Sequence, residues 1–169
     1  MLRAAVASVL LVATLVGTVA AEPIDDVDAS HGRAGYSATG HLPRLHKDAD
    51  QGSPLAQYVL GALYQLGEAV PQDHGEAVKW FSRAADQGLT VAQFALGGMY
   101  TLGHGVPEDI VRAHMWLDLS ATRAAQIEGA QKLARDAQEL RDTLARKMTP
   151  AQMAEAQHLA REWKPKPER

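Results

Sequence analysis

Hydrophobic and small residues recur along the middle of this chain with a period of 36 residues. Within each copy the apolar positions are spaced by three and four, as on one face of an α-helix. A glycine ends the first pattern of each copy, and a second helical pattern follows. A unit of this length forms one helical hairpin that cannot bury its apolar face alone, so the period predicts an all-α stack of hairpins. The recurring positions are Ala56, Leu60, Gly61, Tyr64, Gly67 and Trp80 in the first copy, and Ala92, Leu96, Gly97, Tyr100, Gly103 and Trp116 in the second.

Capping residues set the ends of the first helix in each copy. Ser53 followed by Pro54 is typical of a helix start, because a serine side chain caps free amide groups and proline suits the first turn. Gly67 is typical of a left-handed helix end. The sequence therefore predicts a helix over residues 54–66, and a copy of it one period later.

A second helix is expected after a turn that contains Val70 and Pro71. Asp73 can cap its first turn, with Glu76 as the reciprocal partner in a variant of the capping box. The stripe of this helix alternates small and large side chains, which lets two helices approach closely. The stripe consists of Ala77, Trp80, Phe81, Ala84 and Gly88, and its copy of Ala113, Trp116, Leu117, Ser120 and Ala121.

Incomplete units flank the two copies. Residues 49–52 are identical to residues 85–88, which predicts a half-repeat with a short helix from about Pro43. After the second copy, residues 125–147 are rich in strong helix formers and predict a further helix.

A last helix is expected to follow that one. Thr149, Pro150 and Gln152 have the pattern of a capping box with proline in the first turn, and the helix should reach Trp163. These two helices are expected to cap the C-terminal end of the stack. Residues 164–169 contain two prolines and are expected to form a flexible tail.

The N-terminus has the pattern of a secretory signal peptide over residues 1–21. Arg3 supplies the positive start, an uncharged run of apolar and small residues extends to Ala20, and Glu22 begins a polar segment. An uncleaved membrane anchor is the alternative, because the run approaches the shortest length that spans a bilayer. Residues 22–40 lack an apolar period and are expected to form a flexible linker. The protein is thus expected to be exported, periplasmic or secreted, without stable membrane insertion after cleavage.

Composition and charge narrow the class of protein. With 169 residues, 46% of them hydrophobic, the chain can bury one packed core. It contains no cysteine, which excludes disulfides and thiolate sites. Its net charge of −3 at pH 7 argues against nucleic acid as a partner. Basic residues outnumber acidic ones over 131–169, and this end either meets an acidic surface or forms a solvated helix face.

The two copies resemble the Sel-one-like repeat, a relative of the tetratricopeptide repeat, in the recurring positions named above. The second copy is the better match. With the half-repeat and with residues 148–152, which resemble the ends of bacterial members, the similarity covers residues 41–163. Two positions depart from the family pattern, in which both are glycine. Ala69 suggests a slightly different turn, and Ala124 suggests that the second helix of the second copy continues or bends into the next helix.

The resemblance implies a right-handed superhelix of paired helices that holds proteins or peptides and assembles signalling or envelope complexes. It implies no common reaction, so a non-catalytic adaptor or regulator of the bacterial envelope is the leading interpretation. A few cysteine-rich secreted members are linked to binding or hydrolysing β-lactams. An enzyme or binder acting on cell-wall fragments therefore remains an alternative, and a purely structural oligomer is a third.

The first helix of each copy is apolar nearly all round. One face is expected to pack on the second helix of its hairpin, and the opposite face to line the concave side of the stack. On that face an aromatic groove for a peptide is one interpretation, with the small Ala62 and Gly98 beside it. A surface buried by the N-terminal segment, by the C-terminal helix or by a second copy of the chain is the other. The groove residues would be Leu55, Tyr58, Gln65, Val91, Phe94 and Thr101.

Catalytic and metal-binding signals are weak. The histidines lie in the N-terminal segment or are isolated from other ligands at metal-binding spacing, and His114 is expected to be a half-buried packing residue. Asp73 and Asp109 are explained as helix caps. The sequence therefore predicts no catalytic residue, no metal and no cofactor, and a protein or peptide as the partner.

Overall fold

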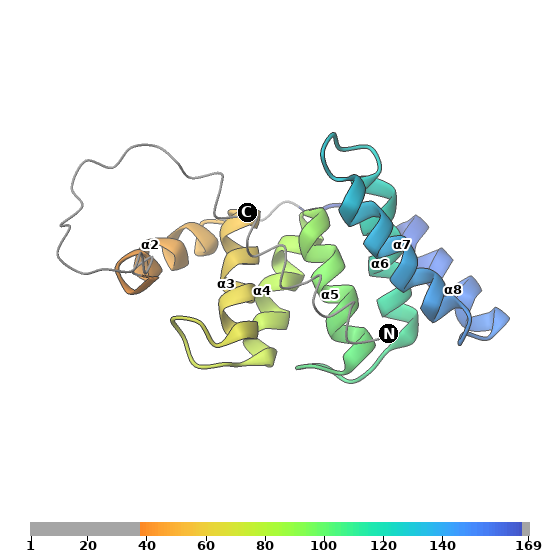
Figure 1. The fold of residues 1–169 in the computed structure, drawn as a ribbon, viewed down its shortest axis with the longest axis horizontal. Helices are drawn as coiled ribbons and strands as arrows, with labels where there is room; N and C mark the ends of the chain where they lie inside the picture. Colours follow the sequence, from red (N-terminus) through yellow and green to blue (C-terminus); the bar gives the residue numbers. More distant parts are fainter. Residues whose placement is uncertain (1–37, 167–169) are drawn as a thin grey trace.

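The computed structural model describes residues 38–166, in which all regular secondary structure is α-helical. Helices α3 to α6 form two antiparallel hairpins side by side along the long axis, with α2 at one end and α7 and α8 at the other (Figure 1). The predicted stack of two hairpins with a preceding half-repeat and a C-terminal helical cap is therefore confirmed. The predicted signal peptide and all but the last residues of the predicted linker lie outside the described part. The helices are α2 (Ala38–Asp50), α3 (Pro54–Leu66), α4 (His74–Asp86), α5 (Thr90–Leu102), α6 (Ile110–Ala124), α7 (Gln131–Ala145) and α8 (Pro150–Glu162).

The ends of α3 agree with the prediction. Ser53 has extended backbone, and its hydroxyl accepts a hydrogen bond from the amide of Ala56 at 3.4 Å. Gly67 ends the helix with φ 74°. Gly103 ends α5 in the same way, with φ 67°. Left-handed backbone of this kind favours glycine, which has no Cβ.

The second helix of each hairpin is capped by aspartate. The carboxylate of Asp73 accepts a hydrogen bond from the amide of Glu76 at 3.0 Å, and Asp109 makes the equivalent bond one repeat later at 2.9 Å. The prediction that Glu76 reciprocates is wrong. The amide of Asp73 donates instead to the carbonyl of Tyr64 at 2.9 Å, and the Glu76 carboxylate pairs with Lys79 at 2.6 Å.

Trp80 and Trp116 lie in equivalent surroundings, as a repeat requires. Trp116 is only 8% exposed, and the ring of Trp163, the residue that follows α8, lies against it with a centroid distance of 6.3 Å. Trp80 is half-buried and lies 6.3 Å from the ring of His46 in α2. The residues clustered with Trp80 include Ala49, Ala56, Leu60 and Leu63, and those clustered with Trp116 are their counterparts Ala85, Ala92, Leu96 and Met99.

Each hairpin depends on a glycine where its two helices are closest. A Cβ on Gly61 would lie 2.6 Å from the ring of Phe81, and a Cβ on Gly97 would lie 2.8 Å from Cγ of Leu117. Phe81 and Leu117 are completely buried, so neither can move aside easily. The glycine after each repeated leucine is therefore required by helix packing.

A buried glutamine ties each hairpin to the helix before it. Gln57 is completely buried and donates from Nε2 to the carbonyl of Ala49 near the end of α2, at 3.0 Å. Gln93 repeats the contact with the carbonyl of Ala85 near the end of α4, at 3.3 Å. A buried side-chain amide needs a hydrogen-bond partner, and these carbonyls supply one, so the core accommodates a polar residue at this position.

The turn at Ala69 corrects one prediction. Ala69 adopts φ 63° and its counterpart Gly105 adopts φ 74°, so the two turns have the same left-handed conformation although one lacks glycine. A residue with a Cβ loses about 1–2 kcal/mol in this conformation. The first hairpin therefore keeps the turn of the second and accepts local strain.

The flanking helices differ from the prediction at their starts. Helix α2 begins at Ala38, inside the predicted linker, and includes Pro43. Helix α6 continues to Ala124 and has 15 residues against 13 in α4, as the missing glycine suggested. Helix α7 begins only at Gln131, because a turn through Gly129, with φ 83°, separates it from α6.

Helix α8 begins as predicted, but the chain after it does not fray at once. Thr149 and Gln152 form the expected capping box. Beyond the helix, the amide of Lys166 donates to the carbonyl of Asp86 at 2.8 Å, which ties residues 164–166 to the end of α4. Residues 167–169 lie outside the described part. None of the helices described is long and apolar enough to cross a bilayer.

Candidate functional site

Tyr58 does not line an open groove. It is 6% exposed, and its ring packs against that of Phe81 with a centroid distance of 5.7 Å. Burial raises the pKa of the Tyr58 phenol to about 12, because the phenolate is poorly solvated there. Tyr58 belongs to the main hydrophobic core, which is built from α3, α4, α5 and α6.

Phe94 is buried as well, and the helix that covers it is α7. The side chain is 5% exposed and clusters with residues of α6 and α7, which include Leu117 and Leu144. The expectation of an open Tyr58 and Phe94 groove is thus corrected in favour of the alternative of a buried surface. A first helix that is apolar all round is an inner helix, since the next hairpin or the C-terminal cap packs on its second face.

The other predicted groove residues are not gathered into one site. Leu55 is 54% exposed, whereas Gln65, Val91 and Thr101 are half-buried. The hydroxyl of Thr101 donates to the carbonyl of Gly97 in its own helix at 2.8 Å, so it is not a free polar group for a ligand.

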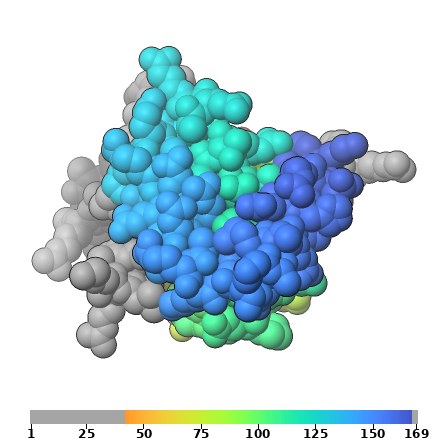
Figure 2. Space-filling view, turned by 90° about the vertical axis from the view of Figure 1, so that its right-hand side faces the viewer, coloured from red at the N-terminus to blue at the C-terminus, as the bar shows by residue number. Residues whose placement is uncertain are grey.

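A groove lies instead at the C-terminal end of the stack. Helices α7 and α8 both pack on α6 but have little contact with each other. Figure 2 shows this end, with α7 in light blue on one side, α8 in dark blue on the other and part of α6 between them. The groove between the three helices has a volume of about 580 Å³.

Apolar and charged side chains share the lining of this groove. The apolar ones come from all three helices, and the charged ones comprise three arginines and two aspartates, with His114 also in the wall. Its lining includes the apolar Leu119, Ala145, Met153 and Ala160, and the charged Asp118, Arg123, Arg141, Asp142 and Arg161.

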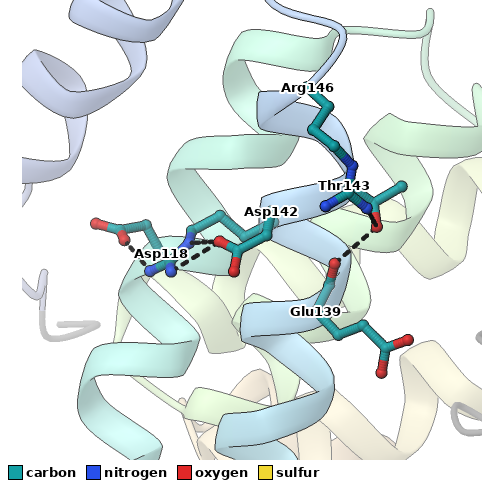
Figure 3. Close-up of polar contacts among 6 residues, drawn as sticks. Asp118, Glu139, Asp142, Thr143 and Arg146 are labelled. Carbon is teal, nitrogen blue, oxygen red and sulfur yellow. Dashed lines mark hydrogen bonds and ion pairs between the residues drawn. The ribbon is translucent and has the colours of Figure 1, made fainter.

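Arg141 of α7 organises the charged side of the groove. Its Nη1 donates to Asp118 of α6 at 2.8 Å, and its Nη2 donates to the neighbouring Asp142 at 2.9 Å. Figure 3 shows the two aspartates on either side of this guanidinium. Burial lowers the pKa of Arg141, but the hydrogen bonds to Asp142 and Asp118 outweigh it, so the net pKa lies above the ordinary value. The pair between α6 and α7 therefore fixes one wall of the groove.

His114 lies in the wall of the groove on α6. It is 5% exposed, and its Nδ1 is buried without a hydrogen-bond partner among the described residues. Burial lowers the pKa of His114, and the charge of Arg141 lowers it further, while Asp118 acts in the opposite direction. His114 was expected to be a half-buried packing residue, and the structure shows that its side chain is buried.

Two further arginines line the groove. The Cζ atom of Arg123 lies 4.7 Å from the ring centroid of Trp163, a cation–π contact that restrains this guanidinium. Arg161 lies on α8. With three arginines against two aspartates, the lining carries a net charge of about +1, which favours a ligand with acidic groups. Among the described residues no group of His, Asp and Glu is arranged to hold a metal ion.

Comparison with known proteins identifies the repeats. The family model described as the Sel1 repeat matches residues 54–89 and 90–124. The chain contains two Sel1 repeats. The matched segments coincide with the two hairpins, α3 with α4 and α5 with α6, and Sel1 repeats generally mediate protein–protein interactions.

Solved structures with Sel1-like folds are similar to this chain. One is the crystal structure of c5321, a protective antigen of uropathogenic Escherichia coli strains that displays an SLR fold. It is 30% identical over 72% of this chain and 24% of that one, with a TM-score of 0.63. A Sel1 repeat protein from Oxalobacter formigenes is 32% identical over 51% of this chain and 35% of that one, with a TM-score of 0.49. This chain thus spans about a quarter and a third of their lengths, and no curated protein matches it.

The groove residues were not found from the sequence as a set. The 36-residue period gives no signal for the charged groove residues. At Asp118 the two repeats differ, and Arg141 and Asp142 lie after the second repeat. Two weak signals existed. One was the excess of basic residues after residue 131, and the other was the missing glycine at Ala124, where the second repeat departs from the first.

Proposed function

We propose that the protein is an exported interaction module, an adaptor or regulator of the bacterial envelope, that binds a protein segment or peptide between α6, α7 and α8. The observation that carries this proposal is the groove itself. Two helices follow the Sel1 repeats; both contact α6, and an open space of about 580 Å³ lies between the three helices. That volume is in the range of ligand-binding clefts, roughly 300–1,000 Å³.

The lining suits a peptide because it offers both hydrogen-bonding groups and apolar surface. A guanidinium has five N–H groups, and the bonds of Arg141 to Asp118 and Asp142 occupy three of them. The remaining two have no partner among the described residues and can donate to a peptide carbonyl or carboxylate. Leu119 and Met153 provide apolar contacts for a side chain beside this polar group.

The envelope location is supported by the signal-peptide pattern over residues 1–21. Cell fractionation of a strain that produces the tagged chain tests it. The proposal expects a shortened form in the periplasm or the medium. A full-length form that stays in the cytoplasm would contradict it.

Site-specific photocrosslinking tests the groove. Thr122 lines the groove and is exposed, so a photoreactive benzoylphenylalanine there should crosslink the bound segment in intact cells. Gln126 is exposed in the turn after α6 but does not line the groove, and it is the matched control. The proposal expects a discrete crosslinked partner from position 122 that is absent from position 126. Equal crosslinking from both, or none from either, would argue against the groove as the binding site.

A further inference from the structure

The first Sel1 repeat has an uncovered face that the second repeat buries. Leu55 is 54% exposed, whereas its counterpart Val91 packs against the main core. Val59, one turn later on the same side, packs partly against the main core but stays half-buried, whereas its counterpart Ala95 is 5% exposed. This side of the first helix is thus more open in α3 than in α5, most of all at Leu55.

The difference lies in what precedes each helix. Val91 packs against the main core, to which Tyr58 of α3 and Phe81 of α4 belong. Before α3 only α2 is present among the described residues, and its Leu45 is the counterpart of Phe81. The counterpart of Tyr58 is Glu22, which cannot supply an aromatic contact. The open face is therefore the place that the first helix of a preceding hairpin would take.

The sequence of this chain before α2 does not resemble such a helix. The segment one period before α3 is residues 18–30, which contains Pro23 and the four acidic residues Glu22, Asp25, Asp26 and Asp28. Helix α3 has no charged residue. An acidic segment with an internal proline would bury charge and interrupt a helix at this place. A helix from another molecule fits the surface better.

The open face forms a groove of about 610 Å³ between α2 and α3. Its apolar lining comprises Leu45, Leu55, Ala56 and Val59, and Asp48 is its one charged lining residue. Asp48 has no ion pair with the other described residues, so a basic residue of a ligand can meet it. The chemistry of the occupant follows from this lining: an amphipathic helix with large apolar residues on one face and a lysine or arginine beside them.

We propose that the groove between α2 and α3 is a second docking surface, which takes an amphipathic, partly basic helix of a partner protein in the place of a preceding repeat helix. The partner helix would pack on α3 in the same way as the first hairpin packs on α5 of the second hairpin. This surface lies at the opposite end of the stack from the groove between α6, α7 and α8 (Figure 1), so the two proposals stand or fall separately.

A helical peptide titrated onto the full chain tests this proposal. The probe is residues 53–67 of the chain itself, which include all of α3, with a fluorescein label and two added lysines, followed by fluorescence anisotropy. The proposal expects saturable binding that Leu55→Asp weakens about tenfold or more, since a buried leucine contact is replaced by a charge. Leu55 is the second residue of α3, where aspartate suits the helix terminus, so the melting temperature should be unchanged.

Ile127→Asp is the matched control, because Ile127 is another exposed apolar residue, 47% exposed, but lies after α6. It should leave peptide binding unchanged, and so should Thr122→Trp, which fills the C-terminal groove. Absence of saturable binding, or equal weakening by Ile127→Asp, would overturn the proposal. A dimer of the chain alone that Leu55→Asp dissociates would assign the surface to a second copy and would also overturn it.

Discussion

Two neighbouring glycines in α5 offer a sharp test of the helix packing. Gly97 faces α6, and a Cβ there would lie 2.8 Å from Cγ of Leu117 and 3.4 Å from the carbonyl oxygen of Ala113. Gly98 is the next residue, and a Cβ there would meet nothing within 4 Å. The substitutions Gly97→Ala and Gly98→Ala therefore change the same helix in the same way, except for the contact with α6.

The expected free energies of unfolding follow from this difference. Alanine in place of glycine within a helix stabilises by about 1 kcal/mol, and this gain applies to both variants. Overpacking a well-filled core costs about 1–3 kcal/mol, and this cost applies only to Gly97→Ala, because Leu117 is completely buried. Gly98→Ala should therefore be more stable than the wild type by about 1 kcal/mol. Gly97→Ala should be less stable than Gly98→Ala by about 1–3 kcal/mol.

Urea unfolding followed by circular dichroism measures both values, and the melting temperature gives a second readout. A change of 1 kcal/mol shifts the melting temperature of domains of 60–250 residues by roughly 2–8 °C. Equal stability of the two variants would show that α5 and α6 do not approach each other at Gly97. The reasoning about the glycine of each repeat would then fail.

Three further predictions concern single residues. Ala69→Gly should stabilise the chain by about 1 kcal/mol, because it relieves the strain of the left-handed φ of 63°. Gly105→Ala should destabilise it by about 2 kcal/mol or more, since a Cβ there would overlap the carbonyl of His74. Urea unfolding measures both changes, and a stabilising effect of Gly105→Ala would contradict the turn geometry. Burial raises the pKa of Tyr58 to about 12 in the folded state, so the free energy of unfolding should fall by about 2–3 kcal/mol as the pH rises from 10 to 12. The variant Tyr58→Phe should lose this part of the pH dependence. If its stability between pH 10 and 12 changes as in the wild type, the burial of Tyr58 is not the cause. Burial lowers the pKa of His114, so the folded state favours the neutral imidazole, and the free energy of unfolding should fall as the pH drops below about 6.5. The variant His114→Gln should lose less stability between pH 7 and 5. Identical curves of stability against pH for the variant and the wild type would exclude His114 as the source.

The hairpins could be predicted from the sequence because local chemistry sets their ends. The cap of Ser53, the left-handed Gly67 and the capping box at Thr149 each involve atoms within a few residues of one another. The 36-residue period then identifies the packed face, since the same residue types return wherever the same contact is made. Trp80 and Trp116 illustrate this, with matching neighbours one repeat apart.

The open surfaces could not be predicted, because they depend on how distant helices are placed. From the sequence of α5 alone, Phe94 is predicted to line a groove. It belongs to the core only because α7 packs on it. Arg141 joins the groove only because α8 crosses to α6 instead of packing along α7. Neither arrangement leaves a pattern in the local sequence. The exposed face at Leu55 depends in the same way on what packs before α3, where α2 is the one helix among the described residues.

The central claim is that a partner binds between α6, α7 and α8. Isothermal titration calorimetry tests it most directly, by measuring the dissociation constant of the partner captured at position 122 with three forms of the chain. The forms are the wild type, Arg141→Gln, and Arg135→Gln as a control on the exposed side of α7. Arg141→Gln removes the guanidinium between Asp118 and Asp142 and should weaken binding about tenfold or more, whereas Arg135→Gln should leave it unchanged. Equal affinity of all three forms would contradict binding between α6, α7 and α8.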